Sequence, residues 1–164
     1  MQIIKDQTVV TDNWQHIAAD TAMSNLPNGD IIIPLQLWNE NKNELQARTE
    51  QLGVRLDSGA DLNEISDHLD KFSVIALEFP AFRDGRGYSL ARRLREHLGY
   101  KGEIRAVGNV LRDQVEYMSR VGINAFEIDS SQEIEDALNA FDDISIKYQA
   151  SSDEAQPFYR RRAS

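Results

Sequence analysis

The sequence predicts an α/β protein built on a small, mainly parallel sheet of about five strands. Short apolar runs alternate along the chain with segments whose apolar residues recur at helical spacing, which is the pattern of βα units. The strongest strand signal, residues 73–79 (SVIALEF), is nearly continuously apolar, as expected of a strand that is buried on both faces. A third signal, two short apolar runs at the start of the chain, predicts an N-terminal hairpin.

The strands of the sheet are predicted at residues 31–33, 54–56, 74–79, 104–107 and 123–128. In the hairpin, Gln2–Ile4 and Thr8–Val10 flank the turn Lys5-Asp6-Gln7. Pro34 closes the 31–33 strand. Because proline has no N–H to donate to a ladder, that strand is expected to be short or to lie at an edge.

Helices are predicted between the strands, where capping signals precede apolar residues at helical spacing. The capping signals lie at Asn41–Glu44, Asp61–Glu64, Asn109 and Ser130–Glu133, and one further helix carries the stripe Leu90, Ala91, Leu94 and Leu98. This order is compatible with an open sheet or with a partial β/α barrel. A full eight-fold barrel needs roughly 200 residues or more, and the chain has 164.

We expect a single domain over residues 1–149, with a final extended segment at Ile144–Tyr148. The polar tail 150–164 is expected to be disordered. Its Phe158–Arg162 sequence, FYRRR, is interpreted either as a docking peptide or as a frayed end.

Composition excludes several classes of function. Without cysteine the chain has no disulfide, thiolate nucleophile, iron–sulfur cluster or cysteine-bound zinc. The N-terminus lacks the pattern of a signal peptide and no apolar run is long enough to span a membrane, so a cytoplasmic location is expected. A net charge of −9 argues against general nucleic-acid binding.

The charge is unevenly distributed. Residues 83–120 hold nine Lys or Arg against five Asp or Glu, although the whole chain is acidic. Such a basic island can attract a small anion, and it can equally be the solvated face of an arginine-rich helix.

Candidate functional groups follow the predicted strands, because ligands of open α/β sheets bind outside the carboxyl ends of the strands. Three segments are expected to meet there: 78–89, 108–113 and 129–131. The first contains FPAFRDGRGYS and carries the clearest signal, since it joins the strongest strand to a helix.

A small anion is predicted to bind at Arg83, Gly85, Arg86, Gly87, Tyr88 and Ser89. The glycines let an anion approach the N–H groups of a helix start. The arginines offer planar donor forks, and the tyrosine and serine add hydroxyl donors. The alternative is structural: Asp84 pairs with an arginine, and the glycines form a tight turn.

The later segments add Arg105, Asn109 and Arg112 to this predicted anion site. Arg105 lies within a strand and needs a partner, because burying an unpaired charge is costly. Glu78 on the preceding strand is the expected partner, in an ion pair that is either structural or part of an active cleft.

Asp84 and Asp113 are the candidate proton carriers for catalysis. For Asp113, a favourable position in the first turn of a helix is the alternative explanation. The three histidines, His16, His68 and His97, lack metal-ligand spacing, so no metal site is predicted.

The signature FPAFRDGRGYS followed by GEIRAVGNVLRDQ, within residues 79–128, resembles a bacterial family of unknown function whose members are described as oxidoreductases involved in sulfite reduction. The resemblance extends from the hairpin to Tyr148-Gln149. It implies an association with sulfite reductase and related enzymes of sulfate assimilation. The matching positions are Phe82, Arg83, Asp84, Gly85, Arg86, Tyr88, Ser89, Arg92, Arg105, Gly108, Arg112, Asp113 and Gln114.

Two positions depart from the family pattern. Asn109 stands where an aspartate is expected, and Val121 where a cysteine is expected. The first departure disfavours a catalytic base at 109, and the second argues against thiol redox chemistry in this chain. No dinucleotide, haem or metal motif is present, so the cofactor, which an oxidoreductase without cysteine would need, is left open.

Three functions are therefore considered. The first is an accessory protein of assimilatory sulfate and sulfite reduction, which binds a small anion or sulfite reductase through the arginine-rich segment 82–93. The second is an enzyme, in the family description an oxidoreductase, that acts on a small anionic substrate at the same site. The third is an interaction domain without a ligand. Homo-oligomerisation stays open in all three.

Overall fold

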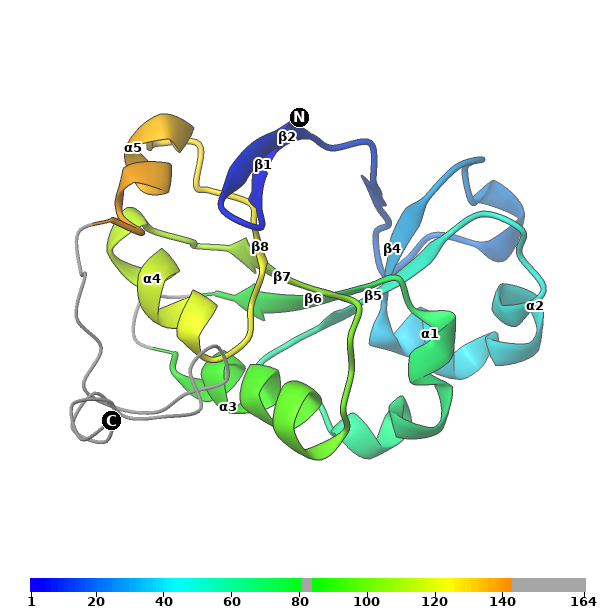
Figure 1. Ribbon diagram of the computed structural model, residues 1–164. Coiled ribbons are helices and arrows are strands. Elements are labelled where there is room, and N and C mark those ends of the chain that lie inside the picture. The colour runs from blue at the N-terminus through cyan, green and yellow to red at the C-terminus, as the bar shows by residue number, and fades with distance from the viewer. Residues whose placement is uncertain (81–83, 143–164) are drawn as a thin grey trace.

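The structure is a computed structural model that describes residues 1–80 and 84–142. Its centre is an eight-stranded sheet with the order β2-β1-β8-β7-β6-β5-β4-β3 (Figure 1). The strands are β1 (Gln2–Lys5), β2 (Thr8–Thr11), β3 (Gln15–His16), β4 (Ile31–Pro34), β5 (Leu52–Leu56), β6 (Val74–Phe79), β7 (Glu103–Gly108) and β8 (Ala125–Phe126).

The sheet is larger than expected and mixed rather than all parallel. Strands β3 to β8 follow one another in chain order and are parallel, whereas β1 pairs antiparallel with both β2 and β8. The predicted hairpin and the five predicted strands are all present. The expectation of about five strands was wrong because the hairpin joins the sheet, and because β3 has only two residues and no sequence signal of its own.

The short β4 ends at Pro34 as expected, but it lies inside the sheet, between β3 and β5. Proline fits there because it is the last residue of the strand. The edge position next to β4 belongs to Gln15 and His16.

Helices and helical turns connect the strands. They are η1 (Met23–Asn25), α1 (Leu35–Glu40), α2 (Lys42–Gln46), η2 (Leu62–Glu64), η3 (Ser66–Lys71), α3 (Arg86–Arg92), η4 (Arg93–His97), α4 (Arg112–Arg120) and α5 (Ile134–Asn139). Here η1 to η3 are 3-10 turns, and η4 continues α3 as a π-helical turn. Within the described residues, no helix is both long enough and apolar enough to cross a membrane.

The capping signals were only partly informative. Asp61 caps η2 by accepting a hydrogen bond from the Asn63 N–H, as expected. Asn41 precedes α2 but donates its side-chain amide to the Leu37 carbonyl instead. The cap positions predicted at Asn109 and Ser130 are wrong, because α4 begins only after Leu111 and α5 only after Glu133.

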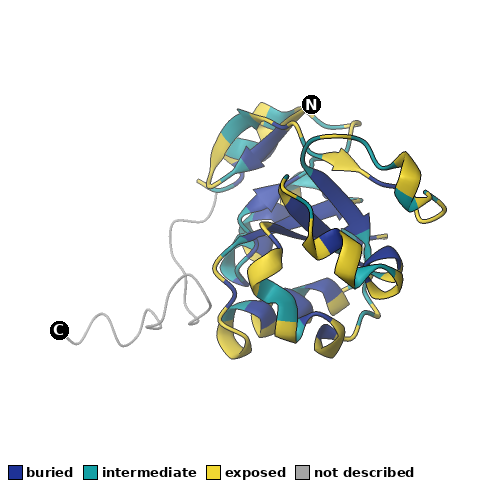
Figure 2. Ribbon diagram, turned by 90° about the vertical axis from the view of Figure 1, so that its right-hand side faces the viewer, coloured by how far each residue is buried: buried dark blue, intermediate teal, exposed yellow. Residues whose placement is uncertain are grey.

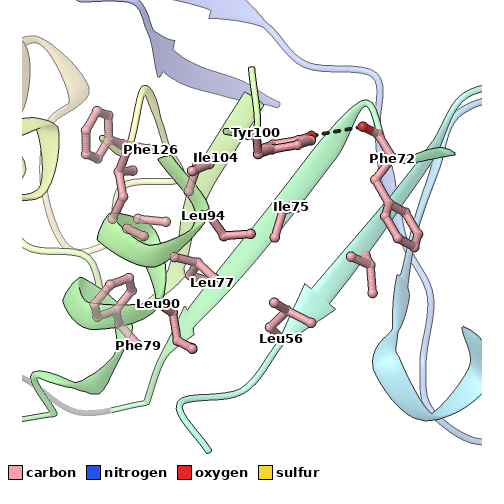
Figure 3. Packing of buried hydrophobic residues seen from close by; sticks show 14 of the residues in the cluster. Leu56, Phe72, Ile75, Leu77, Phe79, Leu90, Leu94, Tyr100, Ile104 and Phe126 are labelled. Atoms are coloured by element: carbon pink, nitrogen blue, oxygen red, sulfur yellow. Dashed lines mark hydrogen bonds between the residues drawn. The ribbon is translucent and has the colours of Figure 1, made fainter. Parts of the chain in front are cut away.

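Most of the core lies between the sheet and its helices. Alternate strand residues such as Ile75, Leu77 and Ile104 join Leu90 and Leu94 of the α3–η4 helix in one buried cluster (Figure 3). Figure 1 shows α1 and α3 below the central strands and the β1–β2 hairpin above them, at the end of the sheet, and Figure 2 shows that the central strands are buried.

The opposite face of the sheet is concave and has a much smaller apolar cluster. Ile32, Val74, Ala76 and Val107 form it, with Trp14 packed against them. Because side chains alternate along a strand, Arg105 lies on this concave face, between Ile104 and Ala106, which belong to the main core.

The curvature of the sheet follows from its topology. β2 and β3 lie at opposite edges, yet only Asp12, Asn13 and Trp14 separate them along the chain. A flat sheet of eight strands would be about 33 Å wide, whereas the link from Thr11 to Gln15 spans at most about 14 Å. The sheet must therefore curl into an open half-barrel, and the link crosses its concave side (Figure 1).

Residues 81–83 and 143–164 lie outside the described part of the chain. The predictions for Phe82, Arg83, the segment Ile144–Tyr148 and the FYRRR tail fall there.

Candidate functional site

The three segments predicted to meet at the carboxyl ends of the strands do lie together. The Asn109 N–H donates to the Phe79 carbonyl over 2.7 Å, which joins the ends of β6 and β7. The Asp129 N–H donates to the Val110 carbonyl, and the Gln132 side chain accepts from the Arg112 N–H over 2.7 Å. We call this region the carboxyl edge.

At the carboxyl edge, Asp84 and Arg86 form an ion pair with two parallel hydrogen bonds. Arg86 Nε donates to Asp84 Oδ1 over 3.0 Å, and Nη2 donates to Oδ2 over 2.9 Å. The aspartate side chain is only 13% exposed, whereas the arginine side chain is 67% exposed. Arg86 thus has its own counter-ion, as in the structural alternative considered from the sequence.

The same contacts fix the ionisation of Asp84. Hydrogen bonds from Arg86, and then from Ser58, hold the pKa of the Asp84 carboxyl well below its usual value. A carboxylate with such a low pKa is a weak proton acceptor near neutral pH, so its environment disfavours Asp84 as a general base.

The two glycines of the segment have different roles. A Cβ on Gly87 would lie 2.6 Å from ring carbons of Phe79, so this glycine lets α3 pack directly on the end of β6. Gly85 has an ordinary backbone conformation with φ of −83°, and the nearest atom to a Cβ there would be 3.8 Å away.

An aromatic row leads from the core to the surface beside this segment. Phe79 contacts Tyr88, and Tyr88 packs edge-on against Tyr117, with ring centroids 5.4 and 5.1 Å apart. Gln114 Nε2 donates to the Tyr88 hydroxyl, and burial raises the pKa of that tyrosine. Tyr117 ends the row and is 49% exposed. It was not singled out from the sequence, because its helical spacing gives no sign of which face stays uncovered.

The remaining predicted groups at the carboxyl edge are also placed. Arg112 pairs with Asp136, Nε to Oδ2, over 3.1 Å. Asp113 and Ser89 are exposed on α4 and α3. Asn109 contributes its backbone to the joint with β6, next to Gly108, whose φ is +89°.

Arg105 lies apart from the carboxyl edge, on the concave face, and the partner predicted for it was wrong. Its guanidinium donates to both carboxylate oxygens of Asp12, each over 3.0 Å, to Glu103 over 2.7 Å and to Glu127 over 2.9 Å. The Oε2 atom of Glu78 lies instead 3.9 Å from Nε of Arg55.

The Arg105 side chain is 1% exposed. Burial alone would lower its pKa, but the hydrogen bonds to Asp12 and the charge of Glu103 hold the pKa of Arg105 above its usual value. The arginine therefore stays charged, with three carboxylates around it.

Lys5 and His16 extend this cluster. Lys5 pairs with Glu103 over 2.8 Å, and the His16 ring lies 2.8 Å from Glu127. Burial would raise the pKa of Glu127, but the bond to His16 and the contact with Arg105 lower it. The cluster joins the hairpin, β7, the end of β8 and the edge strand β3 across the concave face.

Of this cluster, only Arg105 was singled out from the sequence. Glu103 was missed because the predicted strand began at residue 104; two residues apart on one strand, Glu103 and Arg105 share a face. Asp12 could not be found in this way, because 93 positions separate it from Arg105. Within residues 1–80 and 84–142, no group of three or more His, Asp or Glu side chains is arranged to hold a metal ion.

Comparison with known proteins identifies one family. The family model described as bacterial protein of unknown function (DUF934) matches residues 53–159. No curated protein and no solved structure matches the chain. The matched range includes the carboxyl edge and Arg105, and it begins after Asp12 and His16.

Proposed function

The chain belongs to this bacterial family of unknown function, and we propose that it is an accessory protein of assimilatory sulfite reduction that docks on sulfite reductase. The link to sulfite reduction rests on the resemblance carried by FPAFRDGRGYS and GEIRAVGNVLRDQ. The docking surface is the exposed side of α3 and α4, within and beside the predicted segment 82–93.

The observation that carries the docking proposal is the exposure of Tyr117, which packs on α3, together with the exposed arginines of that helix. Tyr117 packs on Tyr88, and Arg92 follows Tyr88 by one helical turn on α3. Arg86 and Arg92 are both exposed. Tyrosine and arginine are the residue types that dominate binding energy at protein interfaces, because each offers a large contact area together with hydrogen-bond donors.

The ion pairs at the carboxyl edge favour a protein partner over a small anion. Asp84 already offsets the charge of Arg86, and Asp136 that of Arg112, so each arginine attracts a small anion less strongly than an unpaired arginine would. A protein surface can instead contact both members of each pair at once. The low pKa of Asp84 also disfavours one of the two proton carriers considered for the enzyme alternative.

The test is binding of the full-length protein to the sulfite reductase holoenzyme of the same bacterium, measured by biolayer interferometry. We expect a saturable complex that Tyr117→Ala and Arg92→Ala each weaken at least about tenfold, in the range of interface hot spots. Leu98→Ala is the matched control. It also truncates an exposed apolar side chain, but it lies beyond η4 at the other end of the helix.

The Leu98→Ala variant should bind like the wild type. Absence of a complex at about 100 µM, or equal losses in Leu98→Ala and Tyr117→Ala, would contradict the proposal.

A further inference from the structure

A cavity lies at the end of the sheet opposite the carboxyl edge. It has a volume of about 510 Å³, within the usual size of small-molecule sites. The β1–β2 turn forms one side, and the ends of η4 and α4 form the others. Its apolar wall contains Ile123, Phe126 and Phe141.

A partly buried arginine borders this cavity without a carboxylate partner. Arg95 donates to the carbonyls of Gly122, Tyr100 and Gly102 and to the side-chain oxygen of Asn124, over 2.8 to 3.1 Å. Among the described residues, no carboxylate lies within ion-pair distance of it. Burial lowers the pKa of Arg95, and the nearby charge of Asp6 opposes that shift only in part.

These four hydrogen bonds use four of the five N–H groups of Arg95, so one N–H group has no acceptor among the described residues. Other donors without an acceptor line the same cavity. In the described part of the chain, Lys101 has no ion-pair partner, and the side chains of Ser119 and Gln7 have no hydrogen-bond partner, although all three line the cavity.

The two acidic residues of the cavity wall are already engaged. Asp6 accepts a hydrogen bond from the Asn124 side chain over 3.0 Å. Glu96 lies 3.8 Å from Arg92, one turn earlier on the same helix. The donors that the cavity offers to an acceptor group of a ligand are therefore those of Arg95, Lys101 and Ser119.

The turn that closes the cavity has an unusual backbone. Asp6 and Gln7 have φ angles of +48° and +58°, in the region where glycine is normally found. Their side chains both line the cavity. A turn that keeps side chains at positions suited to glycine is consistent with a use for those side chains in the cavity.

We propose that this cavity binds a small amphipathic carboxylate. The carboxylate group accepts hydrogen bonds from Lys101, Ser119 and the remaining N–H of Arg95, and the apolar body of the ligand packs against Phe141, which itself packs on the buried Phe126. This site is separate from the proposed docking surface, and neither depends on the other.

The test uses 2-naphthoate as the probe and 2-naphthylmethanol as its neutral counterpart. Binding to the full-length protein is measured by isothermal titration calorimetry and located by amide chemical shifts. We expect saturable binding of 2-naphthoate, at least about tenfold tighter than that of the alcohol. The shifts should centre on Ser119 and Asn124.

Lys101→Glu should weaken 2-naphthoate binding at least about tenfold, because it reverses the charge beside the carboxylate. Lys42→Glu is the matched control, since it makes the same charge change on α2 and should leave binding unchanged. A melting curve verifies that both variants are folded.

Three outcomes overturn the proposal: no saturable binding up to about 5 mM, equal affinity for the alcohol, or chemical shifts that centre elsewhere. None of these measurements involves sulfite reductase, so failure here is distinguishable from failure of the docking proposal.

Discussion

Arg105 shows at the scale of a single residue what the sequence can and cannot predict. A charged side chain within an apolar strand predicts a buried partner, and that prediction is correct. The identity of the partner depends on how distant segments meet in the fold. Glu78 is near in sequence but points along the sheet toward Arg55, whereas Asp12 approaches across the concave face.

The glycines of the predicted anion site give a similar result. Gly85 and Gly87 were interpreted as positions where an anion can approach the backbone. The structure shows that Gly87 is glycine because a side chain there would collide with the Phe79 ring. Sequence alone reveals that a position is glycine, and only the packing around it reveals why.

Replacing Arg105 by methionine should lower the free energy of unfolding by about 3–5 kcal/mol, because three buried or half-buried carboxylates lose their common partner. Urea denaturation followed by circular dichroism measures the change. Glu78→Gln is the control and should cost no more than about 0.5 kcal/mol, as for an ordinary surface change. A large loss in Glu78→Gln would restore the partner expected from the sequence.

At the scale of elements, strands were easier to predict than helix ends. The apolar runs of β4 to β8 were sufficient, because burial on a sheet requires them whatever the rest of the fold. Helix starts were misplaced at α4 and α5, since the chain after β7 and β8 first hydrogen-bonds across the carboxyl edge, and only then turns into a helix. Tertiary contacts outweighed the local capping signals there.

Gly108, at the end of β7, should be sensitive to the addition of a side chain. Its φ is +89°, and a Cβ would lie 2.8 Å from the Phe79 carbonyl oxygen, a backbone atom that cannot move away easily. Gly108→Ala should therefore destabilise the protein by about 1–3 kcal/mol.

Gly85→Ala is the matched comparison, because the same substitution meets no close atom and no positive φ. It should be neutral or stabilise by about 0.4–1 kcal/mol through the unfolded state. Thermal unfolding of both variants measures the difference. Equal melting temperatures would show that the joint between β6 and β7 does not need glycine.

At the scale of the whole molecule, the sequence predicted a sheet covered by helices but did not predict that the sheet curls into a half-barrel. A partial barrel was one of the two architectures considered, and the curled sheet corresponds to it. The link between β2 and β3 is short in the sequence, but it implies a curled sheet only if these strands lie at opposite edges. Their edge positions depend on strand pairing between segments far apart in the sequence.

Two features hold the edges of the half-barrel together, namely the three-residue link itself and the contacts of Asp12 with Arg105 and of His16 with Glu127. Inserting four Gly or Ser residues between Asn13 and Trp14 separates their contributions. The insertion lengthens the link but leaves Asp12 attached to the hairpin. By loop-closure entropy it should cost only about 0.8 kcal/mol, whereas Asp12→Ala leaves Arg105 without its two-bonded partner and should cost about 3–5 kcal/mol.

Urea denaturation of the two variants provides the comparison, and hydrogen exchange of the β1 amides shows whether the hairpin stays docked on β8. We expect protection to survive the insertion and to fall in Asp12→Ala, because Lys5 and Asp12 connect the hairpin to the charged cluster around Arg105. If the insertion is as damaging as Asp12→Ala, the shortness of the link, rather than the buried charges, sets the curvature of the sheet.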